Sequence, residues 1–180
     1  MFFKEALKTI KTTGAVASSS KHLVKRMIAP IDFDNAKIII EFGAGLGVFT
    51  KGLLKNMKPD SKLISYEIND NFFEKLEEIK DDRLVLIKKS VTELKQYVKE
   101  NNIEKVDYIV SGLPLAIFKK ELVDEILTMS HDLLRKGGKY IQFQYSTTSK
   151  AVLKKHFGNL KLNFTPLNIP PAFIYACEKM

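Results

Sequence analysis

The fold of this chain is decided by the stretch Ile38-Ile-Ile-Glu41-Phe-Gly43-Ala-Gly45-Leu-Gly47-Val-Phe-Thr50. Its apolar first half is typical of a buried parallel strand, and its last residues begin a helix. Between them, glycines at every second position let the strand turn sharply and let a ligand approach the backbone closely. Val48 occupies the position at which a dinucleotide-binding motif has its third glycine. The spacing therefore indicates a nucleotide-binding turn, but not the one that holds a pyrophosphate.

Two carboxylates accompany this turn. Glu41 lies at the strand end, where it would repel a pyrophosphate but attract an amino group or a sulfonium. Glu67 ends the next predicted strand 20 residues after Gly47, the spacing at which an acid binds the ribose hydroxyls in a βαβ unit. The alternative is a glycine-rich turn with an unrelated exposed glutamate. Together the two acids favour a nucleoside with a cationic tail, which is S-adenosylmethionine.

Strand and helix signals alternate after Pro30, as in a parallel sheet with helices on both faces. The predicted strands cover residues 37–42, 62–67, 83–88, 106–111 and 139–145, followed by a closing antiparallel pair at 161–167 and 172–178. The predicted helices cover residues 50–57, 70–79, 92–101, 118–135 and 148–157. Lys136-Gly137-Gly138 is expected to end the long helix.

The expected fold is therefore α/β, with a Rossmann-like seven-stranded sheet that is mostly parallel and has an antiparallel C-terminal hairpin. We expect one domain over residues 1–180. Within it, residues 1–30 would form a helical lid or membrane-binding segment, and residues 37–180 the catalytic core. Because the chain stops directly after the seventh predicted strand, recognition is expected to rest on the N-terminal segment and the loops at the carboxyl edge of the sheet.

Composition narrows the class of protein. A single cysteine, Cys177, excludes a disulfide framework and fits a reducing cytoplasm. His22, His131 and His156 have no partners at metal-ligand spacing, so no metal site is expected. No apolar run approaches the ~20 residues of a membrane span, so we expect a cytoplasmic protein, at most peripheral on the inner face of the cell membrane. We also expect a monomer. The net charge of +8 favours a polyanionic partner, either nucleic acid or an anionic membrane surface.

From about Ile38 to its C-terminus, the chain resembles the class I S-adenosylmethionine-dependent methyltransferases. The resemblance rests on the Glu41-x-Gly43-x-Gly45-x-Gly47 motif and on Glu67. It implies that the three glycines line the methionine and ribose portions, that Glu41 lies near the methionine amine and that Glu67 binds the ribose. Further cofactor contacts are expected at Ile68, Ser90, Val91 and Ser111.

The loop after the fourth predicted strand shapes the acceptor site in this fold. Ribosomal RNA adenine dimethylases carry Asn, then Leu or Ile, Pro and an aromatic ring there, and the ring stacks on the base. This chain has Gly112 in place of the Asn and Leu115 in place of the ring, while Phe118 is expected in the core. A stacked base is worth ~1–3 kcal/mol, so the loop disfavours adenine and favours a slim amine. The residues predicted to act at the reacting centre are Ser111, Gly112, Leu113, Pro114 and the strand-end Tyr145.

The N-terminal segment is amphipathic, with Phe2, Phe3 and other apolar residues opposite a lysine-rich face. Such a helix is suited to a lipid interface, and the alternative is a helix packed over the sheet or the cofactor pocket. Residues 18–20 either cap the helix that runs to Ile28 or bind a phosphate. The predicted substrate or membrane contacts are Phe2, Phe3, Lys4, Ser18, Ser19, Ser20 and Lys21.

Five segments together resemble the bacterial phospholipid N-methyltransferases, peripheral enzymes that methylate phosphatidylethanolamine toward phosphatidylcholine. These segments are Phe3-x-Glu5-Ala-Leu, Thr13–Ser20, Ser111–Leu115, Gln142-Phe-Gln-Tyr145 and Asn168-Ile-Pro170-Pro171-Ala-Phe173. The resemblance implies that the first helix binds an anionic membrane and that residues 18–20 lie near the lipid headgroup, although Ala17-Ser18 departs from the family's Ala-Pro. Three alternatives stay open: an RNA or other nucleic-acid adenine methyltransferase, a methyltransferase of an unknown small molecule, and a cofactor-binding protein without catalysis.

Overall fold

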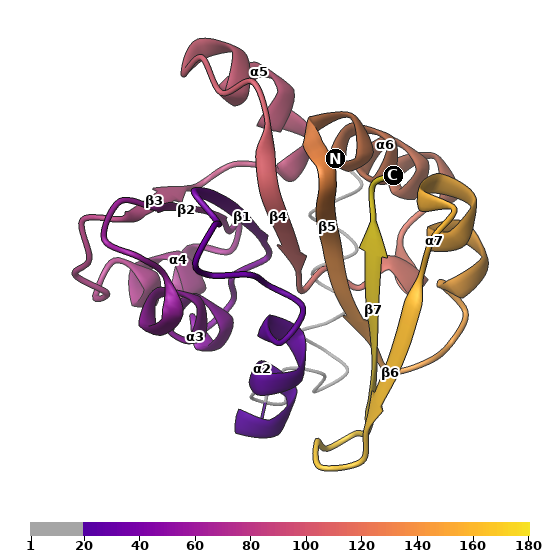
Figure 1. The fold of residues 1–180 in the computed structure, drawn as a ribbon. Coiled ribbons are helices and arrows are strands. Elements are labelled where there is room, and N and C mark those ends of the chain that lie inside the picture. Colours follow the sequence, from indigo (N-terminus) through magenta and orange to yellow (C-terminus); the bar gives the residue numbers. More distant parts are fainter. Residues whose placement is uncertain (1–19) are drawn as a thin grey trace.

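The computed structural model describes residues 20–180, which contain a seven-stranded sheet of order β3-β2-β1-β4-β5-β7-β6 (Figure 1). The strands are β1 (Ile38–Phe42), β2 (Lys62–Tyr66), β3 (Leu84–Ile87), β4 (Val106–Ser111), β5 (Leu134–Gln144), β6 (Lys161–Thr165) and β7 (Ala172–Glu178). The first five strands pair in parallel, and β7 runs antiparallel between β5 and β6. The predicted mostly parallel sheet with an antiparallel C-terminal hairpin is confirmed.

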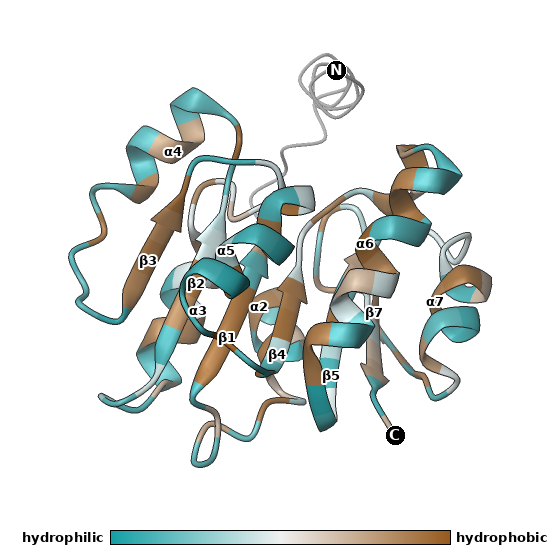
Figure 2. Cartoon of the chain, turned by 90° about the horizontal axis from the view of Figure 1, so that it is seen from above, coloured by the Kyte–Doolittle hydropathy of each residue, from teal (hydrophilic) through white to brown (hydrophobic). Residues whose placement is uncertain are grey.

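Helices cover both faces of the sheet, as predicted. They are α2 (Lys21–Ile28), α3 (Val48–Asn56), α4 (Asp70–Leu76), α5 (Leu94–Glu100), α6 (Lys120–Leu133) and α7 (Lys150–Phe157), with short 3-10 turns η1 (Val91–Glu93) and η2 (Leu115–Ile117). One apolar cluster packs α2 and α3 against the sheet, and a second packs α5, α6 and α7 against it. In Figure 2 the apolar strands lie between helices whose outer surfaces are hydrophilic. The core is therefore a sheet buried on both faces, as expected of parallel strands.

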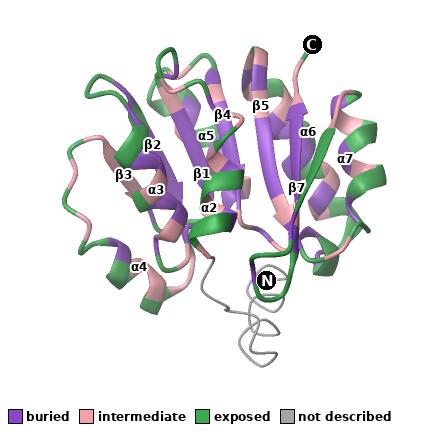
Figure 3. Ribbon diagram, turned by 60° about the horizontal axis from the view of Figure 1, so that its bottom comes forward, coloured by how far each residue is buried: buried purple, intermediate pink, exposed green. Residues whose placement is uncertain are grey.

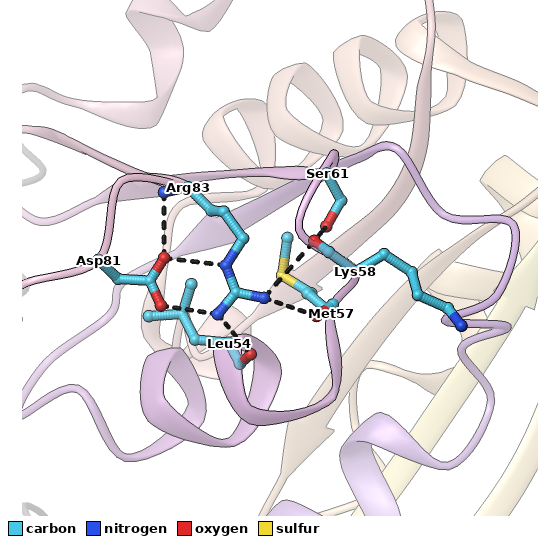
Figure 4. A network of polar contacts seen from close by, with 6 residues as sticks. All are labelled: Leu54, Met57, Lys58, Ser61, Asp81 and Arg83. Atoms are coloured by element: carbon cyan, nitrogen blue, oxygen red, sulfur yellow. Dashed lines mark hydrogen bonds and ion pairs between the residues drawn. The ribbon is translucent and has the colours of Figure 1, made fainter.

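Arg83 fixes the far end of α3, the helix that starts at the glycine turn (Figure 4). Its guanidinium donates hydrogen bonds to the carbonyl oxygens of Leu54 and Met57, the latter the C-cap residue of α3. These carbonyls have no partner within the helix. Asp81 holds the guanidinium through two oxygens at 2.9 and 2.7 Å, and this contact keeps the pKa of Asp81 below its usual value. The network ties the C-terminal end of α3 to the start of β3.

The predicted helix over residues 118–135 is wrong at its C-terminal end. The helix α6 ends at Leu133, and β5 begins at Leu134, five residues before the expected strand. Gly138 does not stop a helix: a Cβ there would lie 2.8 Å from the carbonyl oxygen of Asp107, and Gly137 adopts a φ of +74°. The β4–β5 register shifts at this point, so the two glycines form a bulge in which the strand backbones approach closely.

Four helix starts also differ from the predictions. The first is that of α3, which begins at Val48, two residues before the expected start. Phe118 lies between η2 and α6 rather than inside a helix, residues 91–100 divide into η1 and α5, and α7 begins at Lys150. The predicted helix up to Ile28 is present as α2, and Ser20 caps it by accepting a hydrogen bond from the amide of Leu23 at 3.1 Å. Within residues 20–180 no helix is both long and apolar enough to cross a membrane.

The carboxyl ends of the parallel strands form one edge of the sheet, and the hairpin between β6 and β7 lies at the same edge. This placement follows from the register, because Phe173 at the start of β7 pairs with Gln144 at the end of β5. Figure 3 shows the hairpin and the outer strand β6 as largely exposed. The strand order reverses between β1 and β4, the point at which open α/β sheets bind ligands.

Candidate cofactor and acceptor site

A cavity of ≈ 140 Å³ lies at this reversal point, beside the carboxyl ends of β1, β2 and β4. Its lining consists of Gly43, Gly45, Tyr66, Glu67, Ile68, Phe72, Lys89, Val91, Gly112, Leu113 and Pro114. The structure thus brings together predicted residues from four separate segments of the chain. Of the predicted cofactor residues, Glu41, Gly47, Ser90 and Ser111 lie outside this lining.

The glycine turn forms one wall of the cavity. Gly43 and Gly45 have φ values of +69° and +56°, which side chains rarely adopt. A Cβ built on Gly45 would meet no atom within 4 Å, so this residue borders open space. A Cβ on Gly112 would lie 3.0 Å from the carbonyl oxygen of Gly43, so the turn and the β4 loop are packed backbone to backbone. Gly47 is the N-cap of α3, and a Cβ there would press on Leu76 at 3.0 Å.

Glu67 is nearly buried, and its carboxylate spans the turn. One oxygen accepts the amide hydrogen of Gly45 at 2.8 Å, and the other accepts those of Ile68 and Asn69, also at 2.8 Å. A carboxylate offers about four acceptor positions, and three are used here. The side chain is therefore held at the cavity with capacity left for a hydroxyl group, as the ribose assignment requires.

Glu41 lies behind the turn, with 1% of its surface exposed. One carboxyl oxygen accepts hydrogen bonds from the hydroxyls of Thr50 at 2.8 Å and Ser65 at 2.6 Å. The other oxygen, Oε1, has no hydrogen-bond partner among the described residues. Burial raises the pKa of Glu41 to about 7, although the two hydroxyls act in the opposite direction. A buried acceptor normally has a hydrogen-bond partner, so Oε1 is available to accept a hydrogen bond from a ligand bound at the turn.

Three lining residues are not among those predicted: Tyr66, which directly precedes Glu67 at the end of β2, and two residues from other segments, Phe72 and Lys89. Phe72 lies in the first turn of α4, which Asn69 caps by accepting the amide hydrogen of Phe72 at 3.3 Å. Lys89 lies in the loop between β3 and η1. No spacing in the sequence marks Phe72 and Lys89, because only the fold brings α4 and the loop after β3 to the cavity beside Glu67. The neighbouring Ser90 instead caps η1 with its hydroxyl.

The β4 loop forms the opposite wall, and strand β5 fixes its shape. The carbonyl oxygen of Leu113 accepts hydrogen bonds from the side-chain amides of Gln142 at 2.9 Å and Gln144 at 2.8 Å. A carbonyl has two lone pairs, so this one is not free to accept a substrate hydrogen. The hydroxyl of Ser111, which is buried, accepts the amide hydrogen of Leu113 at 3.3 Å. The sequence signal that marks the two glutamines is the alternation of amide side chains at the end of a buried strand.

No aromatic ring from residues 112–118 faces the cavity. Leu115 and Phe118 are 3% and 9% exposed and belong to the apolar core, as the sequence predicts for Phe118. Tyr145 lies at the same edge of the sheet but outside the cavity lining, with its ring 5.6 Å from that of Phe143. Burial raises the pKa of Tyr145 above its usual value. Its phenol is therefore neutral at physiological pH and does not serve as a general base there.

The predicted headgroup residues are only partly described. Phe2, Phe3, Lys4, Ser18 and Ser19 lie outside the described residues. The backbone amide of Ser20 donates to the side-chain oxygen of Asn168 at 2.9 Å, and its hydroxyl donates to the carbonyl oxygen of Leu167 at 2.8 Å. The start of α2 is thus fastened to the β6–β7 hairpin, with Lys21 exposed beside it. No three metal-binding side chains cluster within residues 20–180.

This arrangement, a glycine turn at the sheet reversal with an acid on the next strand, has a counterpart among known families. The methyltransferase small domain family matches residues 6–165. The chain belongs to this family. It is an S-adenosylmethionine-dependent methyltransferase, and the predicted enzyme class and cofactor are confirmed. When bound, S-adenosylmethionine supplies a methyl group on a positively charged sulfur.

Solved structures share the fold of this methyltransferase. The O-methyltransferase from Bacillus cereus, in complex with SAH, has a TM-score of 0.71 at 14% identity, and the match covers 99% of this chain and 90% of that one. An rRNA methylase from Streptococcus thermophilus has a TM-score of 0.64 at 20% identity, over 87% of this chain and 93% of that one.

Two relatives are similar in sequence. An ornithine lipid N-methyltransferase from Singulisphaera acidiphila is 28% identical over 181 residues, which cover 99% of this chain and 94% of the relative. A ribosomal RNA small subunit methyltransferase A from Mycoplasma mycoides is 30% identical over 138 residues, or 72% of this chain. The matched region spans 50% of that second relative's length.

The residues of this methyltransferase fit its cofactor. Glu67 would hold the ribose, Gly43 and Gly45 would admit the ligand against their backbone, and the unpaired oxygen of Glu41 would accept a hydrogen bond on the methionine side. Ile68 and Val91 add apolar lining next to Glu67. Holding and orienting the cofactor in this way would be most of what methyl transfer asks of a protein.

Proposed function

We propose that this methyltransferase methylates the amine of a phospholipid headgroup at a membrane surface, taking phosphatidylethanolamine toward phosphatidylcholine. The observation that carries the proposal is the β4 loop. Gly112 has no side-chain amide to read a base edge, and both Leu115 and Phe118 are buried in the core. A nucleobase therefore finds no stacking ring in this loop, whereas a small amine needs none.

The full-length similarity to an ornithine lipid N-methyltransferase supports a lipid substrate. That relative's name describes nitrogen methylation of a lipid, the same reaction class on a different headgroup. The match covers 99% of this chain and therefore includes the β6–β7 hairpin.

The acceptor nitrogen must be uncharged, because its lone pair has to be free to form the new bond to the methyl group that S-adenosylmethionine would supply. The proton of the ammonium form must leave first. Tyr145, with its raised pKa, can accept or donate a hydrogen bond at the site's edge but does not take that proton at neutral pH. We therefore assign the orientation of the amine to Tyr145. The proton passes to solvent.

The second candidate function is methylation of adenine in RNA. Its support is the 30% identity to a ribosomal RNA methyltransferase, together with the net charge of +8. The missing asparagine at Gly112 and the missing ring at Leu115 oppose it.

The test offers purified protein and methyl-labelled S-adenosylmethionine three acceptors separately: phosphatidylethanolamine vesicles containing anionic lipid, ornithine lipid vesicles, and total RNA. Label in methylated phosphatidylethanolamine is the expected result. Label in ornithine lipid alone would mean that ornithine lipid, and not phosphatidylethanolamine, is the substrate. Label in RNA alone would overturn the proposal. The Glu67→Gln variant, which removes the charge of the predicted ribose ligand, is the control for cofactor-dependent transfer.

A further inference from the structure

Exposed large apolar side chains concentrate at one edge of the molecule. Of the eight found among the described residues, five lie in loops or short turns at the carboxyl edge of the sheet: Leu46, Ile117, Tyr145, Leu167 and Ile169. The other three lie on strand β6 and at the C-terminal residue. An even scatter would need no explanation, but five on one edge suggest an interface.

This edge is also the edge that holds the cofactor cavity. Leu46 directly follows Gly45 of the cavity wall, and Ile117 lies three residues after Pro114 of the opposite wall. Leu167 and Ile169 lie in the β6–β7 hairpin, which the β5–β7 register places at the same edge. Apolar side chains from three connections thus lie at the same edge of the sheet as the site.

The hairpin contributes the most exposed of these side chains. Ile169 is 86% exposed and Leu167 is 61% exposed, and Figure 3 shows the hairpin loop projecting at the edge of the molecule. The loop is held firmly behind them, because Asn168 is buried and binds both Ser20 and the carbonyl oxygen of Pro170. Two exposed apolar side chains therefore flank a buried residue whose hydrogen bonds hold the hairpin loop in place.

Exposed lysines accompany the apolar residues. Lys21 follows the serine that is bonded to the hairpin, Lys120 lies three residues after Ile117, and Lys150 lies at the start of α7 beyond Tyr145. Basic residues beside apolar ones are the composition that binds an anionic lipid surface.

We propose that an apolar rim, made of Leu46, Ile117, Leu167 and Ile169, enters the interface of an anionic bilayer and turns the cofactor cavity toward the lipid headgroups. This inference rests on the proposed lipid-methylating function and names its partner surface. A bilayer is the occupant because it is a plane. It can meet side chains from three separate loops at once, whereas a peptide needs a continuous groove.

The first experiment uses the full chain labelled with a polarity-sensitive thiol dye. Cys177 is fully buried and burial raises its pKa to about 12, so a dye reacts only with an introduced cysteine. The variants are Leu167→Cys and Ile169→Cys, with Leu162→Cys on β6 as the control at an exposed site away from the rim. Vesicles of phosphatidylethanolamine and phosphatidylglycerol are expected to shift the emission to the blue at positions 167 and 169 and not at 162.

Two outcomes would overturn the proposal. An equal emission shift at all three positions, or no shift at any of them, would mean that the rim is not the part of the protein that enters the bilayer. A blue emission without vesicles that reddens when residues 1–19 are removed would mean that the chain's own N-terminal segment covers the rim.

The second experiment separates this inference from the proposed function. The double variant Leu167→Gln/Ile169→Gln is expected to bind the same vesicles at least about tenfold more weakly than the parent, with Leu162→Gln within about twofold. Cofactor affinity should be unchanged in both, which shows that the site is folded. Rim-dependent vesicle binding with label entering only RNA would leave the rim standing and refute lipid methylation. Lipid methylation that survives in the double variant at full vesicle affinity would refute the rim.

Discussion

At the scale of single residues, Glu41 has the most unusual environment of the site. Its folded-state pKa of about 7 lies above its ordinary value of 4.5, so folding favours the protonated carboxyl. The stability linked to this group is complete below pH 4.5 and is lost as the pH rises through 7. We expect Glu41→Gln, measured without cofactor, to unfold with a free energy that varies less between pH 5 and 7 than that of the parent. The difference should reach up to about 3 kcal/mol.

Urea unfolding at several pH values gives this difference directly. Ser65→Ala is the companion variant: it removes a hydroxyl that lowers the pKa of Glu41, so it should steepen the loss of stability. Parallel curves for the parent and Glu41→Gln would show that the carboxyl titrates normally.

Glu67 is the residue on which the cofactor assignment depends. Replacing it with Gln keeps the shape but removes the charge that strengthens hydrogen bonds to hydroxyls, worth about 1.5–3 kcal/mol. We expect the Kd for S-adenosylmethionine, measured by calorimetry, to rise at least about tenfold. Glu74→Gln, an exposed change on α4, is the matched control and should leave the Kd unchanged. Equal affinity in Glu67→Gln would mean that the ribose is bound elsewhere.

At the scale of elements, strand β5 supports the acceptor loop. Gln144 is 6% exposed and donates one of the two side-chain hydrogen bonds to the Leu113 carbonyl, which also accepts the amide hydrogen of Leu115. Gln144→Leu should cost about 1–2 kcal/mol of stability and lower kcat about tenfold through a looser loop. The KM for S-adenosylmethionine should hold, because Gln144 is outside the cofactor lining. A fall in stability with kcat intact would make Gln144 purely structural.

The tie between α2 and the β6–β7 hairpin is a second element-scale feature. Asn168→Ala removes the acceptor for the amide of Ser20 and the donor to Pro170, both part-buried. We expect a loss of about 1–3 kcal/mol in unfolding free energy. Asn163→Ala on the same hairpin is exposed and should cost less than about 0.5 kcal/mol. Equal effects of the two changes would show that the tie contributes nothing.

The elements also show how far sequence patterns reach. The bounds predicted for β4 and β7 coincide with the structure, because short, largely apolar segments mark buried strands. The sequence does not predict the end of α6, because a Gly-Gly pair such as Gly137-Gly138 occurs both where helices stop and in β-bulges. Only the packing of Gly138 against Asp107 from another strand distinguishes them.

The candidate site divides in the same way. Glu67 and the glycines were predictable because a turn and the next strand end lie at fixed spacing. Phe72 and Lys89 line the cavity from segments distant in sequence, and no local pattern marks them. The two glutamines are marked by their alternation at the end of a buried strand, but their hydrogen bonds to the Leu113 carbonyl depend on a loop that is distant in sequence. The burial of Glu41, and hence its raised pKa, follows from α3 and β2 closing over it.

At the scale of the whole molecule, the sheet separates two tasks. The buried strands and the two apolar clusters give stability, while the carboxyl edge collects the cavity, the rim and the hairpin that holds α2. A net charge of +8 adds a long-range attraction to any anionic surface, which orients the protein only if charge and apolar groups share one edge.

This arrangement predicts a salt dependence that differs between the two ligands. Raising NaCl from about 0.1 M to about 1 M shortens the Debye length from about 10 Å to about 3 Å. Each lysine near an anionic membrane contributes about 1 kcal/mol, so vesicle affinity should fall at least about tenfold. The affinity for S-adenosylmethionine should change little, because Glu67 is buried at the cavity. Neutral phosphatidylcholine vesicles are the control, and their weaker binding should be nearly independent of salt. Full affinity for anionic vesicles in 1 M salt would mean that apolar insertion alone holds the protein on the membrane and that its lysines do not contribute.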